Sequence, residues 1–165
     1  MGILNSEEEH NKFVTDLEKG EVGEQHIIDK YTGINLKAYK SSDKGFDYRY
    51  SDVAVYFKDE LVSLIEVKSE QHKWEETGNH YLEYEYNGKP SGIATTEASY
   101  WALLLYKNNN VEKEFIIPTK KLKEVASEYI NTDRDVSGGD NNKTKGILMP
   151  IEKMQELHEM YGIKR

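Results

Sequence analysis

The stretch from residue 51 to residue 68, SDVAVYFKDELVSLIEVK, constrains the fold of this chain more than any other. Residues 52–57 and 61–68 are rich in Val, Ile, Leu and aromatic side chains, which is typical of strands, and the polar residues 58–60 between them predict a loop. Both faces of the two strands are largely apolar, so we expect a central hairpin with protein layers on both sides.

The register of this hairpin brings two acids together. With a three-residue loop, Phe57 pairs with Leu61, and counting back places Asp52 opposite Glu66. Directly opposed residues share a face of the sheet, with Cβ atoms about 4.5–5.5 Å apart, and Lys68 follows on the same face. Two buried carboxylates this close repel and raise each other's pKa. A hard divalent cation such as Mg²⁺ removes the repulsion, so this corner predicts a metal site.

Asp52 and the run Glu66-Val67-Lys68 resemble the motif of the PD-(D/E)XK nuclease superfamily, which has the restriction-endonuclease-like fold; Ser51 stands where the motif has Pro. The resemblance implies that Asp52 and Glu66 bind one or two Mg²⁺ or Mn²⁺ ions, with Val67 among the metal-binding residues. It also implies that Lys68 positions and activates the attacking water. The alternative is a Glu66–Lys68 surface pair at a strand end, with Asp52 capping a turn.

A helix predicted over residues 21–31 supplies a further candidate, Glu24. Glu24, Ile27, Ile28 and Tyr31 fall at positions i, i+3, i+4 and i+7, so the acid lies on the buried stripe of the helix. In the nuclease family the first helix often supplies a Glu to the metal site, and the resemblance assigns that catalytic role to Glu24. The alternative is an acid that interacts only with the helix dipole.

Other acids compete for places in the site. Asp47 is a rival for Asp52, although it lies five residues upstream and outside the register just derived. Residues 81–86 alternate as the third strand of the sheet should, and of its two acids we expect Glu85 rather than Glu83 to reach the site. The alternative is a surface pair on an edge strand.

The segment NGKPSGIATTEASYW predicts a substrate-binding loop. Its Gly and Pro residues indicate a tight loop, and Thr95 or Thr96 caps a helix expected to run to Leu105. Backbone amides at a helix N-terminus form a natural anion site. This turn would deliver Lys89, Ser91 and Thr95 to a phosphate beside the metal, although loop chemistry alone also explains these residues.

The rest of the chain predicts alternating strands and helices. We expect a helix from a capping box at Ser6, a strand over 114–117 followed by a helix, a polar loop over 131–146, and a strand over 147–149 before a helix opened by Pro150. Together these elements predict one α/β domain over residues 1–165. Its expected architecture is a restriction-endonuclease-like three-layer core, a mixed central β-sheet flanked by helices.

Composition limits the class of protein. The net charge is −8 and the pI about 5.2, which counts against a non-specific nucleic-acid binder. Basic residues nevertheless cluster as a candidate phosphate track. The clusters are Lys37, Lys40, Lys44 and Arg49, then Lys120, Lys121 and Lys123, then Lys143 and Lys145. The 12 tyrosines could stack on bases or fill the edges of the core.

These observations lead us to expect an Mg²⁺- or Mn²⁺-dependent nuclease that acts on nucleic acid, DNA more than RNA. The alternatives are a catalytically silent nuclease-fold module that binds nucleic acid or a protein partner, and an interaction module with a plain salt-bridge cluster. The chain has no cysteine and no long apolar run, which indicates a cytoplasmic protein without a membrane span. A homodimer and a phage-encoded protein acting in the host cytoplasm fit the same observations.

Overall fold

The computed structural model describes residues 20–71 and 73–164. Residues 20–30 are helical, and Gly20, proposed to end or bend a helix, is itself part of that helix. The helix predicted from Ser6 lies outside the described residues. After residues 20–30 the elements, with η for a 3₁₀ turn, are β1 (Leu36–Lys40), η1 (Ser41–Lys44), β2 (Val53–Phe57), β3 (Glu60–Glu70), α2 (Lys73–Thr77), β4 (Asn79–Tyr86), β5 (Lys89–Pro90), η2 (Gly92–Ala94), β6 (Tyr100–Lys107), β7 (Asn110–Pro118), α3 (Thr119–Glu128), β8 (Asp135–Gly138), η3 (Asp140–Asn142), β9 (Thr144–Pro150) and α4 (Ile151–Tyr161).

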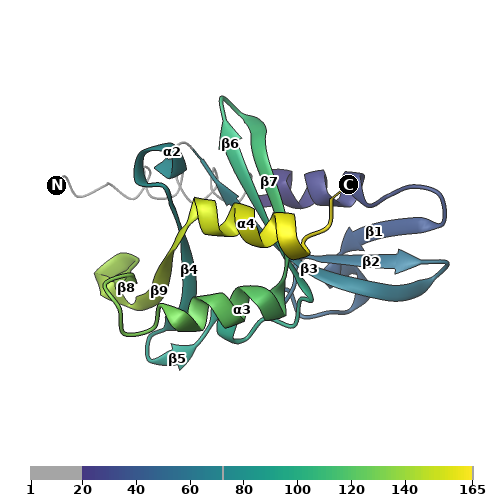
Figure 1. The fold of residues 1–165 in the computed structure, drawn as a ribbon. Helices are drawn as coiled ribbons and strands as arrows, with labels where there is room; N and C mark the ends of the chain where they lie inside the picture. The colour runs from purple at the N-terminus through teal and green to yellow at the C-terminus, as the bar shows by residue number, and fades with distance from the viewer. Residues whose placement is uncertain (1–19, 72, 165) are drawn as a thin grey trace, which may run out of the picture.

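The strands form two sheets (Figure 1). The main sheet has the order β1-β2-β3-β6-β7, and the second sheet has the order β5-β4-β9-β8. β3 and β6 run parallel, while the other neighbours in the main sheet are antiparallel. The chain is therefore an α/β protein with a mixed central sheet and flanking helices, as predicted. None of the helices in the described ranges is long and apolar enough to cross a membrane.

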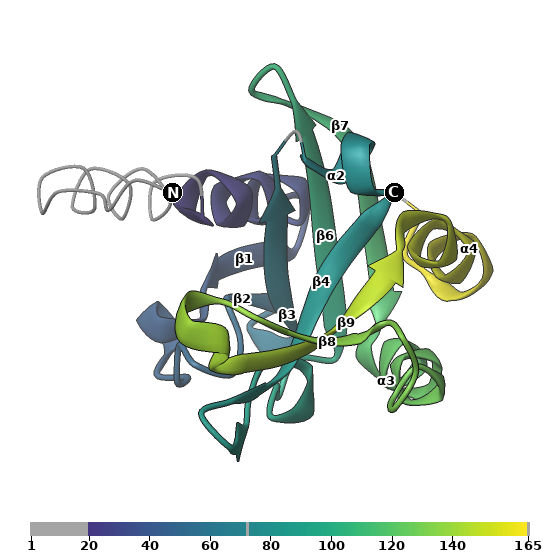
Figure 2. The ribbon, with the colours of Figure 1, turned by 90° about the vertical axis from the view of Figure 1, so that its left-hand side faces the viewer.

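Both faces of the main sheet are covered at its centre (Figure 2). On β6, Trp101, Leu103 and Leu105 face the second sheet, α3 and α4, while Ala102 and Leu104 face the helix over residues 20–30. All five side chains are essentially inaccessible to solvent. Because the sheet is the middle layer, its central strands carry apolar residues at every position rather than at alternate ones.

The helix predicted to run from Thr95 or Thr96 to Leu105 is wrong, because most of that segment is β6. Its run of apolar residues fits a buried strand as well as a buried helix, and periodicity cannot separate the two. The strand predicted over 81–86 exists as β4, but it belongs to the second sheet and is not the third strand of the main one. The polar loop predicted over 131–146 contains β8 and the start of β9.

Four C-terminal predictions are confirmed. The strand over 114–117 lies within β7, and the helix after it is α3. The strand over 147–149 lies within β9, and Pro150 directly precedes α4.

The loop of the central hairpin is shorter than predicted. Lys58 and Asp59 form a two-residue turn, both with positive φ (47° and 66°), so that Phe57 pairs with Glu60. Positive φ at both positions is the geometry whose twist matches that of the flanking strands. The predicted pairing of Phe57 with Leu61 is therefore wrong.

An irregularity in the same hairpin restores the predicted register near the site. The pairing shifts by one residue between Val55 and Tyr56, so that Val55 lies opposite Ser63 and Val53 opposite Ile65. The paired residues end at Val53, and the Asp52 N–H donates to the Ile65 carbonyl, so the predicted pairing of Asp52 with Glu66 stays a prediction. The hairpin is buried on both faces at this end, as predicted. At the other end Phe57, Leu61 and Val62 are exposed.

Candidate active site

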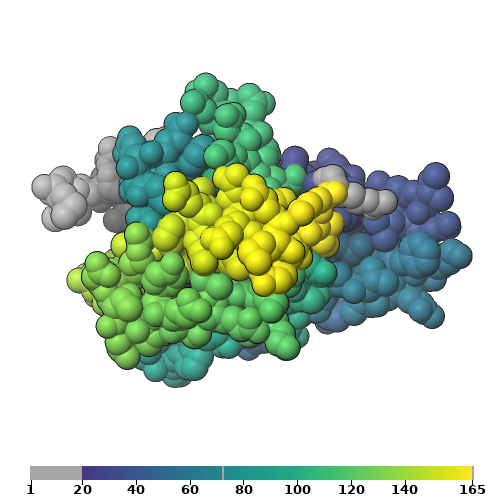
Figure 3. All heavy atoms as spheres, in the orientation of Figure 1, coloured from purple at the N-terminus to yellow at the C-terminus, as the bar shows by residue number. Residues whose placement is uncertain are grey.

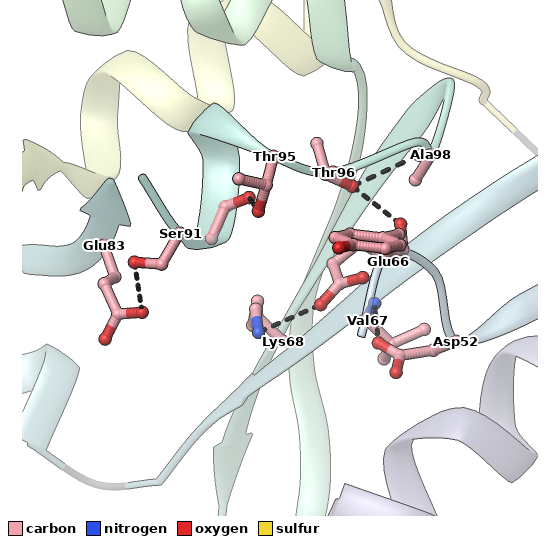
Figure 4. Close-up of polar contacts among 11 residues, drawn as sticks. Asp52, Glu66, Val67, Lys68, Glu83, Ser91, Thr95, Thr96 and Ala98 are labelled. Atoms are coloured by element: carbon pink, nitrogen blue, oxygen red, sulfur yellow. Dashed lines mark hydrogen bonds and ion pairs between the residues drawn. The ribbon is translucent and has the colours of Figure 1, made fainter. Parts of the chain in front are cut away.

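The carboxylate of Asp52 is fixed by the backbone of β3. β2 begins at Val53, and the last ladder bond runs from the Asp52 N–H to the Ile65 carbonyl at 2.9 Å. Two residues further along β3, the N–H of Val67 points to the same side as the Ile65 carbonyl. It donates to Asp52 Oδ2 at 2.8 Å instead of to a backbone carbonyl of β2 (Figure 4). Val67 points its side chain into the core beneath the helix, so only its backbone carbonyl could contact a metal.

Glu66 and Lys68 lie on one face of β3. Glu66 is buried, and its Oε1 lies 3.1 Å from Lys68 Nζ (Figure 4). The lysine is the more exposed partner, with 42% of its side chain accessible against 12% for Glu66. Its ammonium also lies 5.5 Å from the ring centre of Trp101 on β6. The second carboxylate oxygen, Glu66 Oε2, is buried without a hydrogen-bond partner.

These groups perturb one another's titration. The pKa of Glu66 is raised to about 7: burial raises it most, the charge of Lys68 opposes the rise, and the charge of Asp52 adds to it. Burial also raises the pKa of Asp52, against the Val67 hydrogen bond and the charge of Lys68. Burial lowers the pKa of Lys68, but Glu66 and Asp52 outweigh it and hold that pKa above its usual value. The lysine therefore stays charged, while the two acids resist ionising together.

The N-terminal helix brings Glu24 toward these residues. Gly23 lets the helix lie directly on the sheet, because a Cβ there would overlap Ser69 Oγ on β3 and contact Val67 and Leu104. The next residue, Glu24, is half-buried. Burial raises the pKa of Glu24 to about 7, with a further contribution from Asp52. Glu24 therefore lies close enough to Asp52 and Glu66 for their charges to raise its pKa, and its role in a metal site stays a prediction.

Asp47, the rival of Asp52, is engaged elsewhere. Its Oδ2 lies 2.6 Å from Arg49 Nη2, and its Oδ1 accepts from the Arg49 backbone and side chain. These hydrogen bonds lower the pKa of Asp47 to about 2. The geometry favours Asp52 as the acid that accompanies Glu66.

The predicted substrate loop does not form the anion site expected of it. The helix whose N-terminus would bind phosphate is absent, and in its place stands the three-residue turn η2. Ser91 Oγ donates to Glu83 Oε2 at 2.9 Å, and Thr95 Oγ1 donates to the carbonyl of Gly92 at 3.4 Å. Lys89 lies exposed on β5, at the edge of the second sheet.

Two residues that bear on the site were missed or misjudged. Glu83 helps to raise the pKa of Lys68, whereas Glu85, the acid favoured from the sequence, lies 3.6 Å from Lys145. The pairing of β4 with β9 shifts between the two acids, so simple alternation misplaces them. Thr96 Oγ1 donates to the Tyr50 carbonyl at 3.1 Å and so anchors the loop beside the start of β2, whereas the sequence indicated Thr96 only as a possible helix cap.

In the part of the chain that the structure describes, no group of three or more His, Cys, Asp or Glu side chains is placed so that it could hold a metal ion. The site is therefore a pair of adjacent carboxylates with a lysine, and Glu24 lies near them. Comparison with protein-family models, curated proteins and solved structures finds no match to this chain.

Proposed function

We propose that this chain is a metal-dependent nuclease of the PD-(D/E)XK type, which hydrolyses phosphodiester bonds in nucleic acid, DNA more than RNA. One observation carries the proposal: Glu66 has a buried oxygen with no hydrogen-bond partner among the described residues, pairs with Lys68 through its other oxygen, and lies close enough to Asp52 for that charge to raise its pKa. A buried carboxylate oxygen without a donor is costly unless a cation or a donor satisfies it.

The residues present fit an Mg²⁺ or Mn²⁺ ion. Mg²⁺ in such sites takes one or two carboxylates and completes its shell with water and phosphate oxygens, so a third protein carboxylate is not required. Asp52 and Glu66 would hold the ion, Glu24 would assist, and Val67 would offer its carbonyl. When bound, the ion lowers the pKa of a coordinated water and neutralises charge on the phosphate.

The other groups have roles that follow from their positions. The Val67 N–H fixes one oxygen of Asp52 and leaves the other free. Lys68 is charged and partly exposed, so its ammonium can leave Glu66 and donate to the attacking water or to a phosphate oxygen. Glu83 adds negative charge near Lys68 and keeps it protonated.

A second candidate function is a silent nuclease-fold module that binds nucleic acid or a protein partner. The 3.1 Å Glu66–Lys68 ion pair favours it, because this pair already satisfies one Glu66 oxygen without metal.

Incubation with supercoiled DNA, linear duplex, single-stranded DNA and RNA, in Mg²⁺, Mn²⁺ or EDTA, separates the two functions. The nuclease cleaves at least one substrate with metal and none in EDTA. Glu66→Gln should abolish cleavage, whereas the matched variant Asp47→Asn should cleave like the wild type. A protein that binds these substrates but leaves all of them intact in both metals is the silent module.

A further inference from the structure

The face of the main sheet that carries Glu66 also carries aromatic and basic residues at its β1 edge. In the antiparallel pairing of β1 with β2, Lys37 lies opposite Tyr56, and Tyr39 lies opposite Ala54. Opposed residues share a face, and Ala38, between Lys37 and Tyr39, points to the other face, into the core beneath the helix. Lys37, Tyr39 and Tyr56 therefore lie on the face of Glu66, because Ala54 lies opposite Leu64, two residues before Glu66.

The two tyrosines form one aromatic surface with a lysine above it. The Tyr39 and Tyr56 rings are 5.8 Å apart and nearly perpendicular, and both are half-buried. Lys44 Nζ lies 4.4 Å from the centre of the Tyr39 ring and 5.0 Å from that of Tyr56. We call Lys37, Tyr39, Lys44, Tyr56 and Lys58 the aromatic–basic patch.

The patch ends in a small cavity at the tip of the hairpin. Lys37, Tyr56, Lys58, Asn35 and Asp59 line about 150 Å³ there. Among the described residues, none of the patch lysines lies within ion-pair distance of a carboxylate, although Asp59 shares the cavity wall. Neighbouring cations, by contrast, are paired: Lys40 with Glu21 and Arg49 with Asp47.

The second sheet and the C-terminal helices leave this part of the sheet open. Figures 1 and 3 show β1 and β2 extending away from α3 and α4. Tyr56 lies four residues from Asp52 along the strand direction, a distance of about 13 Å at 3.3 Å per residue. A ligand on the patch would therefore reach the acids without leaving this face.

We propose that the aromatic–basic patch binds an unpaired polynucleotide strand and leads it to Asp52 and Glu66. Bases stack on the tyrosine rings, and Lys37, Lys44 and Lys58 contact the phosphates. The inference rests on the proposed function, since it names the form of nucleic acid that the site receives. The chemistry is common to DNA and RNA.

Charge and stacking together favour an unpaired strand over a duplex. Duplex binding without base contacts depends on many phosphate contacts. This chain has a net charge of −8, and the three lysines of the patch can make only a few such contacts. Stacking on an aromatic side chain requires an exposed base face, which a duplex hides. Each stacked base is worth roughly five- to 150-fold in affinity. Stacking on two rings is therefore enough to decide the preference for a single strand over a duplex.

The test measures binding in EDTA, where no cleavage can occur. Fluorescence anisotropy compares labelled oligo(dT), oligo(rU) and a DNA duplex of equal length, each of about 16 nucleotides or base pairs, the upper range for a single-strand site. We expect at least one single strand to bind roughly tenfold or more tightly than the duplex. The DNA and RNA arms identify which polynucleotide the patch prefers.

A second cation–π pair in the same molecule provides the matched controls. Lys121 Nζ lies 4.8 Å from the centre of the Tyr161 ring, on α3 and α4 and away from the patch. Tyr39→Leu should weaken single-strand binding roughly five-fold or more, whereas Tyr161→Leu should not change it. Lys44→Ala should reduce the salt slope, log Kd against log salt, by about 0.7, and Lys121→Ala should leave it unchanged.

Equal affinity for duplex and single strand would overturn the proposal, as would identical binding by Tyr39→Leu and Tyr161→Leu. If Tyr39→Leu fails to fold, the exposed Lys44→Ala decides the question through its salt slope. Patch-dependent single-strand binding without cleavage in any metal would remove the proposed nuclease and leave this inference standing. Cleavage that is insensitive to Tyr39→Leu and Lys44→Ala would remove this inference alone.

Discussion

The backbone N–H of Val67 donates to Asp52 Oδ2 at 2.8 Å, directly beyond the last ladder bond between β2 and β3. The bond depends on register, because a slip of one residue would turn Asp52 to the opposite face of the sheet. One backbone contact thus fixes the carboxylate of Asp52 against the strand that carries Glu66.

Asp52→Asn should raise the melting temperature of the metal-free protein. The amide oxygen can still accept from the Val67 N–H, while the repulsion with Glu66 and Glu24 disappears. The same change should reduce the stabilisation that added Mg²⁺ gives by mass action. Thermal unfolding with EDTA and with a Mg²⁺ titration measures both effects.

Asp47→Asn is the matched control for that experiment. It removes an exposed ion pair with Arg49, which is worth about 0–1 kcal/mol, and should leave the Mg²⁺ response intact. A lower melting temperature for metal-free Asp52→Asn would instead identify Asp52 as a structural partner of Lys68.

The raised pKa values of Glu66 and Glu24 predict how stability depends on pH without metal. Each rises from 4.5 in the unfolded chain to about 7 in the folded one. In that interval the folded protein holds protons that the unfolded chain has released, so the free energy of unfolding falls as the pH rises from about 4.5 to about 7. The slope is at most about 1.4 kcal/mol per pH unit for each group.

Glu66→Gln should flatten this dependence, as measured by urea unfolding in EDTA across the same pH interval. Glu128→Gln, on the exposed side of α3, should not alter it. An unchanged slope in Glu66→Gln would show that the Glu66 carboxyl ionises normally in the folded protein.

Lys68→Ala should retain metal binding and lose nuclease activity, because the lysine acts on water or phosphate and not on the metal. We expect cleavage to fall by well over a hundredfold, within the range typical of positioned proton-transfer groups. Lys107→Ala removes another lysine that pairs with a glutamate, Glu75 at 3.0 Å, and should leave cleavage unchanged. Wild-type cleavage by Lys68→Ala would refute the nuclease assignment.

The sequence was most informative where alternation is strict and one face is polar. The register that puts Val53 opposite Ile65 follows from the pattern of residues 51–68, and it survived an error in the loop because a shift at Val55 compensates for the shorter turn. The helices after Pro118 and Pro150 were predictable from local rules. Proline lacks a backbone N–H, and at the start of a helix that N–H would have no partner within the helix anyway.

Sequence reasoning failed where tertiary context decides the structure. β6 is apolar at nearly every position because the sheet is covered on both sides. Its sequence therefore lacks the alternation of apolar and polar residues that identifies a strand. β8 is short and polar, DVSG, and forms only through its pairing with β9. The position of Glu83 depends on an irregularity in β4 that no local pattern specifies.

Glu24 offers the sharpest remaining test of the site, because Glu21 lies one turn earlier on the same helix. Glu21 is exposed and its Oε1 lies 3.9 Å from Lys40 Nζ, whereas Glu24 is half-buried and its pKa is raised by burial and by Asp52. Glu24→Gln keeps the shape and removes the charge. If Glu24 serves the metal site, this change should weaken Mg²⁺ affinity or reduce turnover by well over tenfold with little effect on folding. An acid that interacts only with the helix dipole is worth about 0.3–1 kcal/mol of stability, and its loss would leave activity alone. We expect that second behaviour from Glu21→Gln, so equal activity of the two variants, measured at saturating and at limiting Mg²⁺, would remove Glu24 from the site.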